Sequence, residues 1–316
     1  IRAYIQEHGG EFRFSEQLTD VRIRDGRLAE IVTTRGSEPC DELVLAVGHS
    51  ARDTFEMLLS RGFVIEQKEF AVGVRMEHLQ EKIGRAQYGA GYAALPPADY
   101  KLVSHASDRG VFTFCMCPGG VVIPAASEEG GVVTNGMSDF ARAGRNANSA
   151  LVVQVFRSDF GSEHPLAGVQ FQRKLERAAF AAAGGGYRAP VQLVGDFLAD
   201  KESYYFGEVR PTYAPGTAFV PMQAIFPRAV TDAMKAALPD MNARLSGIAA
   251  YESVLTGVES RTSSPVRIVR GPDLQAAGIA GIYPCGEGCG YAGGITSAAA
   301  DGIRVAEALA EKYAEI

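Results

Sequence analysis

The sequence predicts an α/β protein in which the two ends of the chain share one sheet and the middle is inserted between them. The run DELVLAVG, which ends at Gly48, is continuously apolar between acids and a glycine. Such a run favours a strand buried on both faces of a largely parallel sheet. The segment IAGIYPCGEG, which ends at Gly288, is likewise a short, mostly apolar run that ends in glycines. From about Phe63 the sequence changes to β-rich runs separated by glycine turns, which favours a mostly antiparallel layer.

The first 62 residues are expected to contain short strands and helices in alternation. IRAYIQEHGG is typical of a helix that stops at Gly9, and EFRF follows as a short strand. QLTDVRIRDGRLAEIVTTRG predicts a hairpin, because two β-rich runs meet at Asp25-Gly26. After DELVLAVG, Ser50 is a candidate N-cap for an amphipathic helix that ends near Gly62.

The middle of the chain is expected to form a separate, β-rich domain with some helices. FVIEQKEFAVGVRME and VFTFCMCPGGVVIPAASEEGGVVTNGMS read as its strands. Helices are predicted over about 171–183 and over 228–249, the second with a break before Pro239 because proline disrupts a helix interior. The predicted domains are residues 1–58 with 266–316, and residues 59–265.

Composition and charge limit the classes of partner. The chain of 316 residues is 47% hydrophobic and carries a formal net charge of −6, with no block of Lys or Arg. A nucleic-acid surface is therefore not expected. No apolar run approaches the ~20 residues that span a bilayer, so a membrane partner is not expected either. The remaining partner class is a small-molecule substrate, and the oligomeric state stays open.

The five cysteines favour a reducing compartment and no metal. An odd count without framework spacing is typical of cytoplasmic proteins, so we expect a cytoplasmic location. The pairs Cys115/Cys117 and Cys285/Cys289 do not complete a tetrahedral ligand set, and the histidines are scattered. A C-x-C pair on a strand places both side chains on one face. Two buried, inert cysteines are favoured there over a redox-active dithiol.

The spacing G-x-G-x-x-G occurs at Gly288, Gly290 and Gly293, between a predicted strand and a final helix. A dinucleotide fingerprint needs a second strand and an acid ~20 residues later, and the helix is still running when the sequence ends. This is therefore a last βα unit and not a first one. A glycine turn present for packing alone is the alternative. The face of the final helix expected to be buried comprises Ile295, Ala298, Ala299, Gly302, Ile303, Ala306 and Leu309.

Several stretches, taken together, resemble a large group of poorly characterised bacterial FAD-dependent dehydrogenases. They are LAVGHSARDTFEML, KEFAVGVRMEH, FCMCPGG, ESRTSSPVRI and GEGCGYAGGITSAAADGI. That group is similar to the glutathione-reductase-like flavoproteins. The resemblance implies a partial FAD-binding Rossmann-like domain with an inserted β-rich α+β substrate domain. It also implies an FAD-dependent oxidoreductase, or dehydrogenase, that transfers a hydride between a small-molecule substrate and the flavin.

The resemblance also assigns positions around the cofactor. LAVGHS would lie near the adenosine–pyrophosphate half of FAD, and a main-chain contact to adenine is implied near the first hairpin strand. The acid and glycines of the last βα unit would approach the ribityl chain and the flavin edge, where a helix N-terminus stabilises negative charge. The implied cofactor-binding residues are Leu18, Ala46, Gly48, His49, Gly286, Glu287, Gly293, Gly294 and Ile295.

TGVESRTSSPVRI precedes the return to the FAD domain, where an inserted domain reaches the flavin. Glu259, Arg261 and Thr262 are the candidate catalytic residues, because they offer an acid, a fixed cation and a hydroxyl. An Arg–Glu surface pair that caps a strand is an equally weighted alternative.

Family members carry a G-x-G-x-x-G unit near the start of the FAD domain, and this sequence has none before Gly48. We therefore expect the chain to begin inside that domain. NAD(P)H is a candidate electron donor, although without a second fingerprint it would need another mode of docking. Two other functions stay open: a non-catalytic binding or scaffold protein on a degenerate flavin fold, and a flavin-dependent RNA-modifying enzyme, which the acidic charge disfavours.

Overall fold

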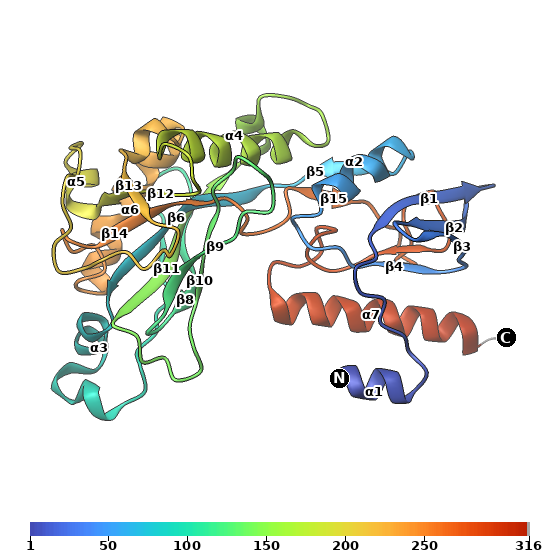
Figure 1. The fold of residues 1–316 in the computed structure, drawn as a ribbon, viewed down its shortest axis with the longest axis horizontal. Coiled ribbons are helices and arrows are strands. Elements are labelled where there is room, and N and C mark those ends of the chain that lie inside the picture. Colours follow the sequence, from blue (N-terminus) through green and yellow to red (C-terminus); the bar gives the residue numbers. More distant parts are fainter. Residues whose placement is uncertain (315–316) are drawn as a thin grey trace. The chain divides into compact units, whose positions relative to one another are not determined.

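The computed structural model describes residues 1–314, which form two compact units (Figure 1). Unit 1 combines Ile1–Glu66 with the chain from Val266 onward, and unit 2 is Gln67–Pro265. The chain passes between the units at β5 (Ile65–Gln67) and β15 (Val266–Ile268), which pair as a two-stranded sheet. Unit 1 is therefore built from both ends of the sequence.

Unit 1 begins with α1 (Arg2–Glu7) and a three-stranded antiparallel sheet of β1 (Leu18–Arg24), β2 (Arg27–Thr33) and β3 (Gly36–Pro39). The Asp25-Gly26 hairpin is confirmed. Both turn residues have left-handed φ values, +50° and +71°, as a type I′ turn requires. The strand expected at residues 11–14 is wrong, since this segment pairs with no strand among the described residues and is exposed.

The second sheet of unit 1 is small and parallel. β4 (Leu43–Leu45) pairs with β16 (Ile282–Pro284), so the two apolar runs that predicted a parallel sheet do lie side by side. The helices that follow them are α2 (Arg52–Ser60) and α7 (Ile295–Ala314). The predicted cap was wrong: α2 has Ala51 at its N-cap without a side-chain bond, and the Ser50 hydroxyl lies 2.9 Å from Nδ1 of His49.

The buried side of α7 agrees only in part with the expected one, because Ala298, Gly302 and Leu309 are half-buried while the other expected residues are exposed. Among its described residues the helix fully buries Asp301 and Val305, whereas Ile295 is 93% exposed and Ile303 is 60% exposed. The helix is therefore anchored through a buried carboxylate as well as through apolar contacts, among them Leu309 against Val305 and Tyr283. Its exposed apolar face comprises Ile295, Ala299, Ile303 and Ala306.

Unit 2 is built on a seven-stranded sheet in the order β13-β12-β14-β6-β11-β8-β7. Neighbouring strands are antiparallel except β12 and β13, which confirms the mostly antiparallel layer expected here. The strands are β6 (Phe70–Leu79), β7 (Val103–Ser104), β8 (Val111–Cys117), β11 (Asn146–Val155), β12 (Ala189–Leu193), β13 (Thr217–Phe219) and β14 (Val254–Glu259).

The two faces of this sheet have different chemistry. One face is apolar and contributes Met76, Leu151 and Val153 to a core with α4 (Ala167–Ala182) and α6 (Arg228–Arg244). The other face carries Arg75, Glu77, Asn146 and Asn148, which the alternation of strand side chains places together. The hairpin of β9 (Val121–Pro124) and β10 (Thr134–Met137) packs on this polar face.

The remaining helices of unit 2 are α3 (Gln80–Tyr88) and α5 (Val194–Leu198), with short 3₁₀ segments at Gly89–Ala94, Arg157–Phe160 and Met222–Ala224. The helix break predicted before Pro239 is wrong, because α6 runs through this residue. Leu238 and Met241 on either side of it are completely buried. Core packing therefore outweighs the local cost of the proline.

Candidate functional site

Two glycine-containing turns meet at one edge of the parallel sheet in unit 1. β4 and β16 run in the same direction, so the turns after Leu45 and after Pro284 emerge at the same edge. The N–H of Cys285 donates to Leu45 O (3.0 Å), and so does the Sγ of Cys289 (3.0 Å). A Cβ on Gly288 would lie 1.7 Å from Val47 O. The turns are therefore packed backbone against backbone.

A histidine and an acid extend from the two turns toward each other. Nε2 of His49, after β4, lies 3.8 Å from Oε1 of Glu287, after β16, and the two side chains are 30% and 25% exposed. The structure thus brings Ala46, Gly48 and His49 close to Gly286 and Glu287. In open α/β sheets, ligands bind outside the carboxyl ends of the strands, which is where these residues lie.

The start of α7 is open to a ligand. A Cβ placed on Gly293 or on Gly294 would have nothing within 4 Å. Ala298 N–H donates to Gly294 O (2.9 Å), so the amides of Ile295 to Ser297 belong to the first turn, whose N–H groups an α-helix does not use internally. The helix has 20 residues and brings partial positive charge to this end.

Gly286 shapes its turn and has both main-chain groups engaged there. Its φ is +74°, which glycine adopts without cost. Its N–H donates to Oδ2 of Asp301 (2.8 Å), and its carbonyl accepts the N–H of Tyr291 (3.0 Å). Asp301 also forms a buried ion pair with Arg270, with an N–O distance of 2.6 Å. Burial raises the pKa of Asp301, but the hydrogen bonds from Arg270 and Gly286 outweigh it and lower that pKa below its usual range.

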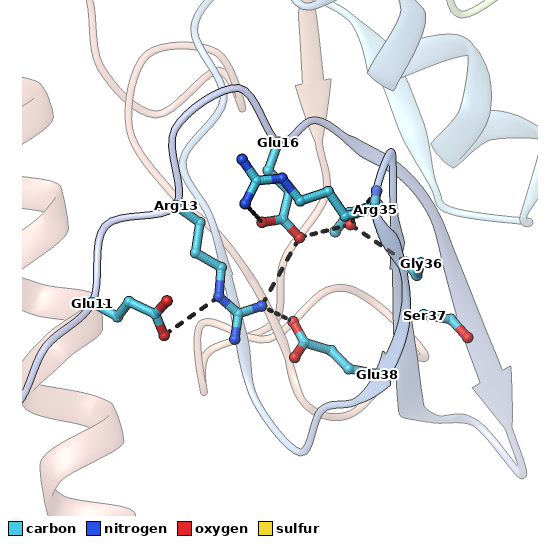
Figure 2. A pocket seen from close by; sticks show the side chains of 8 residues that line it. Glu11, Arg13, Glu16, Arg35, Gly36, Ser37 and Glu38 are labelled. Carbon is cyan, nitrogen blue, oxygen red and sulfur yellow. Dashed lines mark hydrogen bonds and ion pairs between the residues drawn. The ribbon is translucent and has the colours of Figure 1, made fainter.

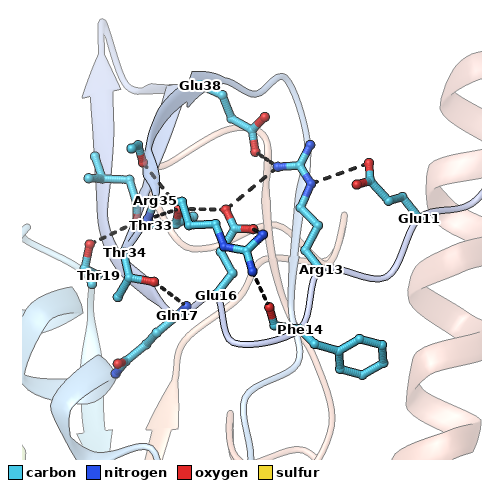
Figure 3. Close-up of polar contacts among 12 residues, drawn as sticks. Glu11, Arg13, Phe14, Glu16, Gln17, Thr19, Thr33, Thr34, Arg35 and Glu38 are labelled. Carbon is cyan, nitrogen blue, oxygen red and sulfur yellow. Dashed lines mark hydrogen bonds and ion pairs between the residues drawn. The ribbon is translucent and has the colours of Figure 1, made fainter.

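Leu18 lies on the antiparallel sheet of unit 1 and belongs to neither turn. The residue before it is held by main-chain bonds: Gln17 N–H donates to Oγ1 of Thr34 (3.2 Å), and Thr34 N–H donates to Gln17 O (2.9 Å), as Figure 3 shows in part. The segment that leads into β1 is therefore fixed on the first hairpin.

A polar hollow of about 330 Å³ lies beside that segment (Figure 2). Arg13 pairs with Glu38 and lies 3.5 Å from Glu11. Arg35 lies 3.8 Å from Glu16 and donates to Phe14 O (2.7 Å). Because each guanidinium is already paired with a carboxylate of the same cluster, the hollow fits a role in pinning residues 11–17 and not an anion site.

The candidate catalytic residues lie in unit 2 and do not pair with one another. Glu259 is 4% exposed and holds Arg75 through two bonds, of 2.9 and 3.1 Å. Arg261 is 8% exposed and pairs with Glu176 (2.8 Å). Thr262 donates its hydroxyl to Ala71 O (2.8 Å). The surface Arg–Glu pair weighed as an alternative is wrong, because both charges are buried with other partners.

The C-x-C pair does not lie on one face as expected. A β-bulge in β8 places Cys115 at φ +47° and exposes it, while Cys117 is buried. All five cysteines are free thiols. Burial raises the pKa of Cys117, although Arg75 counteracts it. The expectation of two buried cysteines is therefore wrong for Cys115.

A thiol-reactive dye is expected to modify one cysteine per chain rapidly, and Cys115→Ser should remove that phase. The other thiols react slowly, because burial raises their pKa, to about 12 for Cys289. Cys289→Ser should leave the fast phase intact. The resemblance to flavoproteins also predicts that, in the full-length enzyme, the double variant Cys115→Ser/Cys117→Ser keeps the rate of flavin reduction within a few-fold, measured by stopped-flow absorbance. A collapse of that rate with normal FAD content would instead support a dithiol mechanism.

Comparison with known proteins identifies the family. A family model described as "FAD-dependent protein, C-terminal domain-like" matches residues 69–262, which is more than half of the chain and nearly all of unit 2. The chain belongs to this FAD-dependent protein family. An uncharacterised protein of Clostridium beijerinckii is 48% identical over 99% of the chain. The chain spans 60% of the length of that relative.

The family assignment and the mixed α/β architecture agree with the flavoprotein resemblance. Within residues 1–314, no helix combines the length and the apolar character needed to cross a membrane.

The sequence pattern indicated the glycines of the last βα unit, but it did not indicate the three residues that pack behind them, Arg270, Tyr291 and Asp301. The available signal was an aspartate in a stretch of the helix, residues 295–303, that carries no other charge, because such a carboxylate is buried only with a partner.

Proposed function

We propose that unit 1 binds FAD at the two turns and the start of α7, and that the native protein is an FAD-dependent oxidoreductase. The observation that carries this proposal is the open space at Gly293 and Gly294, directly before the first turn of a long helix. In the same unit, Gly288 is packed against backbone and leaves no room for a Cβ. Two glycines of the motif, Gly288 and Gly290, thus pack the fold, whereas Gly293 and the neighbouring Gly294 leave space for a ligand.

The residues present fit FAD in chemistry as well as in space. The amides of Ile295 to Ser297 would meet negative charge at the flavin edge. Glu287 would accept hydrogen bonds from ribityl hydroxyls, and Gly48 with His49 would lie on the pyrophosphate side. The main chain at Leu18 would contact adenine. When bound, FAD supplies a group that accepts or returns a hydride.

The substrate is proposed to be a small molecule, and Glu259, Arg261 and Thr262 of unit 2 are proposed to act on it. Glu259 is the last residue of β14, and Arg261 and Thr262 follow it just before the chain leaves unit 2 at Pro265. Because Glu259 and Arg261 already hold buried partners, their contribution is to orient and to provide a fixed field, and not to shuttle protons. The proposed location is the cytoplasm.

Gly293→Ala and Gly294→Ala test where FAD binds. A methyl group at either position meets nothing in the free protein, so the free energy of unfolding without FAD should change by about 1 kcal/mol or less. With FAD bound, the same methyl would occupy space needed by the cofactor. We expect the Kd for FAD to rise at least about ten-fold, measured by fluorescence titration of the apoprotein. The protein used here and below has native length, meaning the length of the Clostridium relative.

Gly302→Ala is the matched control, because this glycine also has nothing within 4 Å but lies inside α7. It should stabilise the helix by up to ~1 kcal/mol and leave the Kd unchanged. Wild-type affinity in both Gly293→Ala and Gly294→Ala would place the flavin elsewhere. A native-length protein without a reducible yellow cofactor would favour the non-catalytic alternative.

A further inference from the structure

A buried ion pair connects three segments behind the glycine turn. Arg270 follows β15, and Asp301 lies in the second turn of α7. Their side chains are 6% and 5% exposed, and the guanidinium donates to both carboxylate oxygens, at 2.6 and 3.0 Å. Such a bidentate arrangement fixes the relative position of the two segments.

Both members of the pair also bind the backbone of the turn. Arg270 donates to Pro284 O at the end of β16 (2.7 Å), and Asp301 accepts the N–H of Gly286 (2.8 Å). The pair therefore joins the strand end, the turn and the helix by bonds to each of them. A shift of α7 along its axis would break at least one of these bonds.

Tyr291 contacts Arg270 through both its ring and its hydroxyl. The guanidinium of Arg270 lies 3.7 Å from the centroid of the Tyr291 ring, a cation–π contact. The Tyr291 hydroxyl accepts the main-chain N–H of Arg270 and donates to Ile268 O, each at 3.0 Å. The N–H of Tyr291 returns to Gly286 O. We call Arg270, Tyr291 and Asp301 the turn clamp.

A buried pair of this kind is a poor source of stability compared with apolar packing of the same volume, since both charges must be desolvated. Its bonds are directed, however, and apolar packing would fix the turn less tightly. We propose that the turn clamp positions the Gly286–Gly290 turn against the first turn of α7 and thereby sets the affinity of the site for FAD. Its members are positioning residues, and this inference rests on the proposed function.

The test uses the native-length protein with Asp301→Asn, an isosteric change that removes the charge. Two quantities are measured at a temperature well below the Tm of the variant: the Kd for FAD, and the rates of amide hydrogen exchange in the apoprotein. We expect the Kd to rise at least about ten-fold. Exchange at Gly286 and Tyr291 should accelerate to a similar degree, while amides in β6 and β11 keep wild-type rates. The matched acid-to-amide control is Glu30→Gln, whose carboxylate pairs with the exposed Arg22.

Each outcome decides the inference. Wild-type exchange at Gly286 and Tyr291 in Asp301→Asn overturns it, and so does faster exchange with an unchanged Kd. If the wild-type protein binds no FAD, the proposed function fails, and the exchange measurement alone still shows whether the clamp holds the turn. Should Asp301→Asn not fold, Tyr291→Phe keeps the ring and removes the hydroxyl. That variant should speed exchange at Arg270 and weaken FAD binding a few-fold, and no change in either would refute the clamp.

Discussion

Replacing Arg75 with methionine should lower the free energy of unfolding of unit 2 by about 3–5 kcal/mol. Arg75 is fully buried, and its guanidinium donates to Glu259, Asn148, Asn135 and Cys115 O. Without it, Glu259 is a buried carboxylate that has lost its cation. Chemical denaturation of wild type and variant measures the difference.

The loss should depend on pH in a defined direction. Burial raises the pKa of Glu259, and Arg75 opposes this in the wild type. In Arg75→Met only burial remains, so the folded-state pKa lies above the unfolded one. The variant is therefore least destabilised at acidic pH, where Glu259 is protonated in both states, and loses stability as the pH rises through the raised pKa.

Two comparisons make the Arg75 result interpretable. Arg75→Met/Glu259→Leu should recover much of the loss, because neither member of this buried pair is then left without its partner, although Asn148 and Asn135 still lose their donor. Arg22→Met removes the exposed partner of Glu30 and should change little, since solvent screens that pair. A double variant as unstable as the single one would show that packing around Arg75, and not its charge, carries the effect.

The 316-residue chain expressed alone should purify without stoichiometric FAD and should self-associate. In the part of the chain that is described, β4 and β16 pair only with each other, and Val44, the middle residue of β4, is 40% exposed. A two-stranded parallel sheet is rarely stable by itself, and its open edges invite pairing between chains. The relative from Clostridium is longer than this chain, so its native fold has more material to cover such surfaces.

Light scattering after gel filtration and the ratio of flavin to protein absorbance test this expectation. Ile303→Lys on the exposed face of α7 should reduce association, because Ile303 is 60% exposed. A version extended to the length of the Clostridium relative should be yellow and monodisperse. A monodisperse short chain that carries one FAD per monomer would show that it already contains the whole site.

Local signals predicted elements best where one dihedral or one short run decided the structure. Asp25-Gly26 specified its hairpin because a two-residue turn with left-handed φ accepts few sequences. The apolar runs at β4 and β16 indicated their parallel pairing. Of the two strands β16 is buried throughout, whereas Val44 of β4 is 40% exposed. The glycine turn of the last βα unit could also be recognised locally, because a strand, a run of spaced glycines and a helix follow one another in a short stretch of sequence.

Features that depend on distant partners could not be read in this way. Asp301 anchors α7 through Arg270, and the apolar period of the helix therefore located only half of its buried side. The bulge at Cys115 places its carbonyl where Arg75 on another strand binds it. Glu259 and Arg261 are close in sequence but have different partners, Arg75 and Glu176. These pairings become visible only once the strands are placed.

The backbone contact between the two turns has a consequence for the order of folding. Cys289 bonds to Leu45 O across 244 residues. At about 5–20 residues per second, a ribosome needs on the order of 10–50 s to make that stretch, and β4 has no parallel partner until then. Unit 2 is complete earlier, and its ends are already joined, since Lys68 N–H donates to Pro265 O (3.0 Å). Folding of the insertion thus removes most of the entropy cost of closing unit 1, which completes its parallel sheet last.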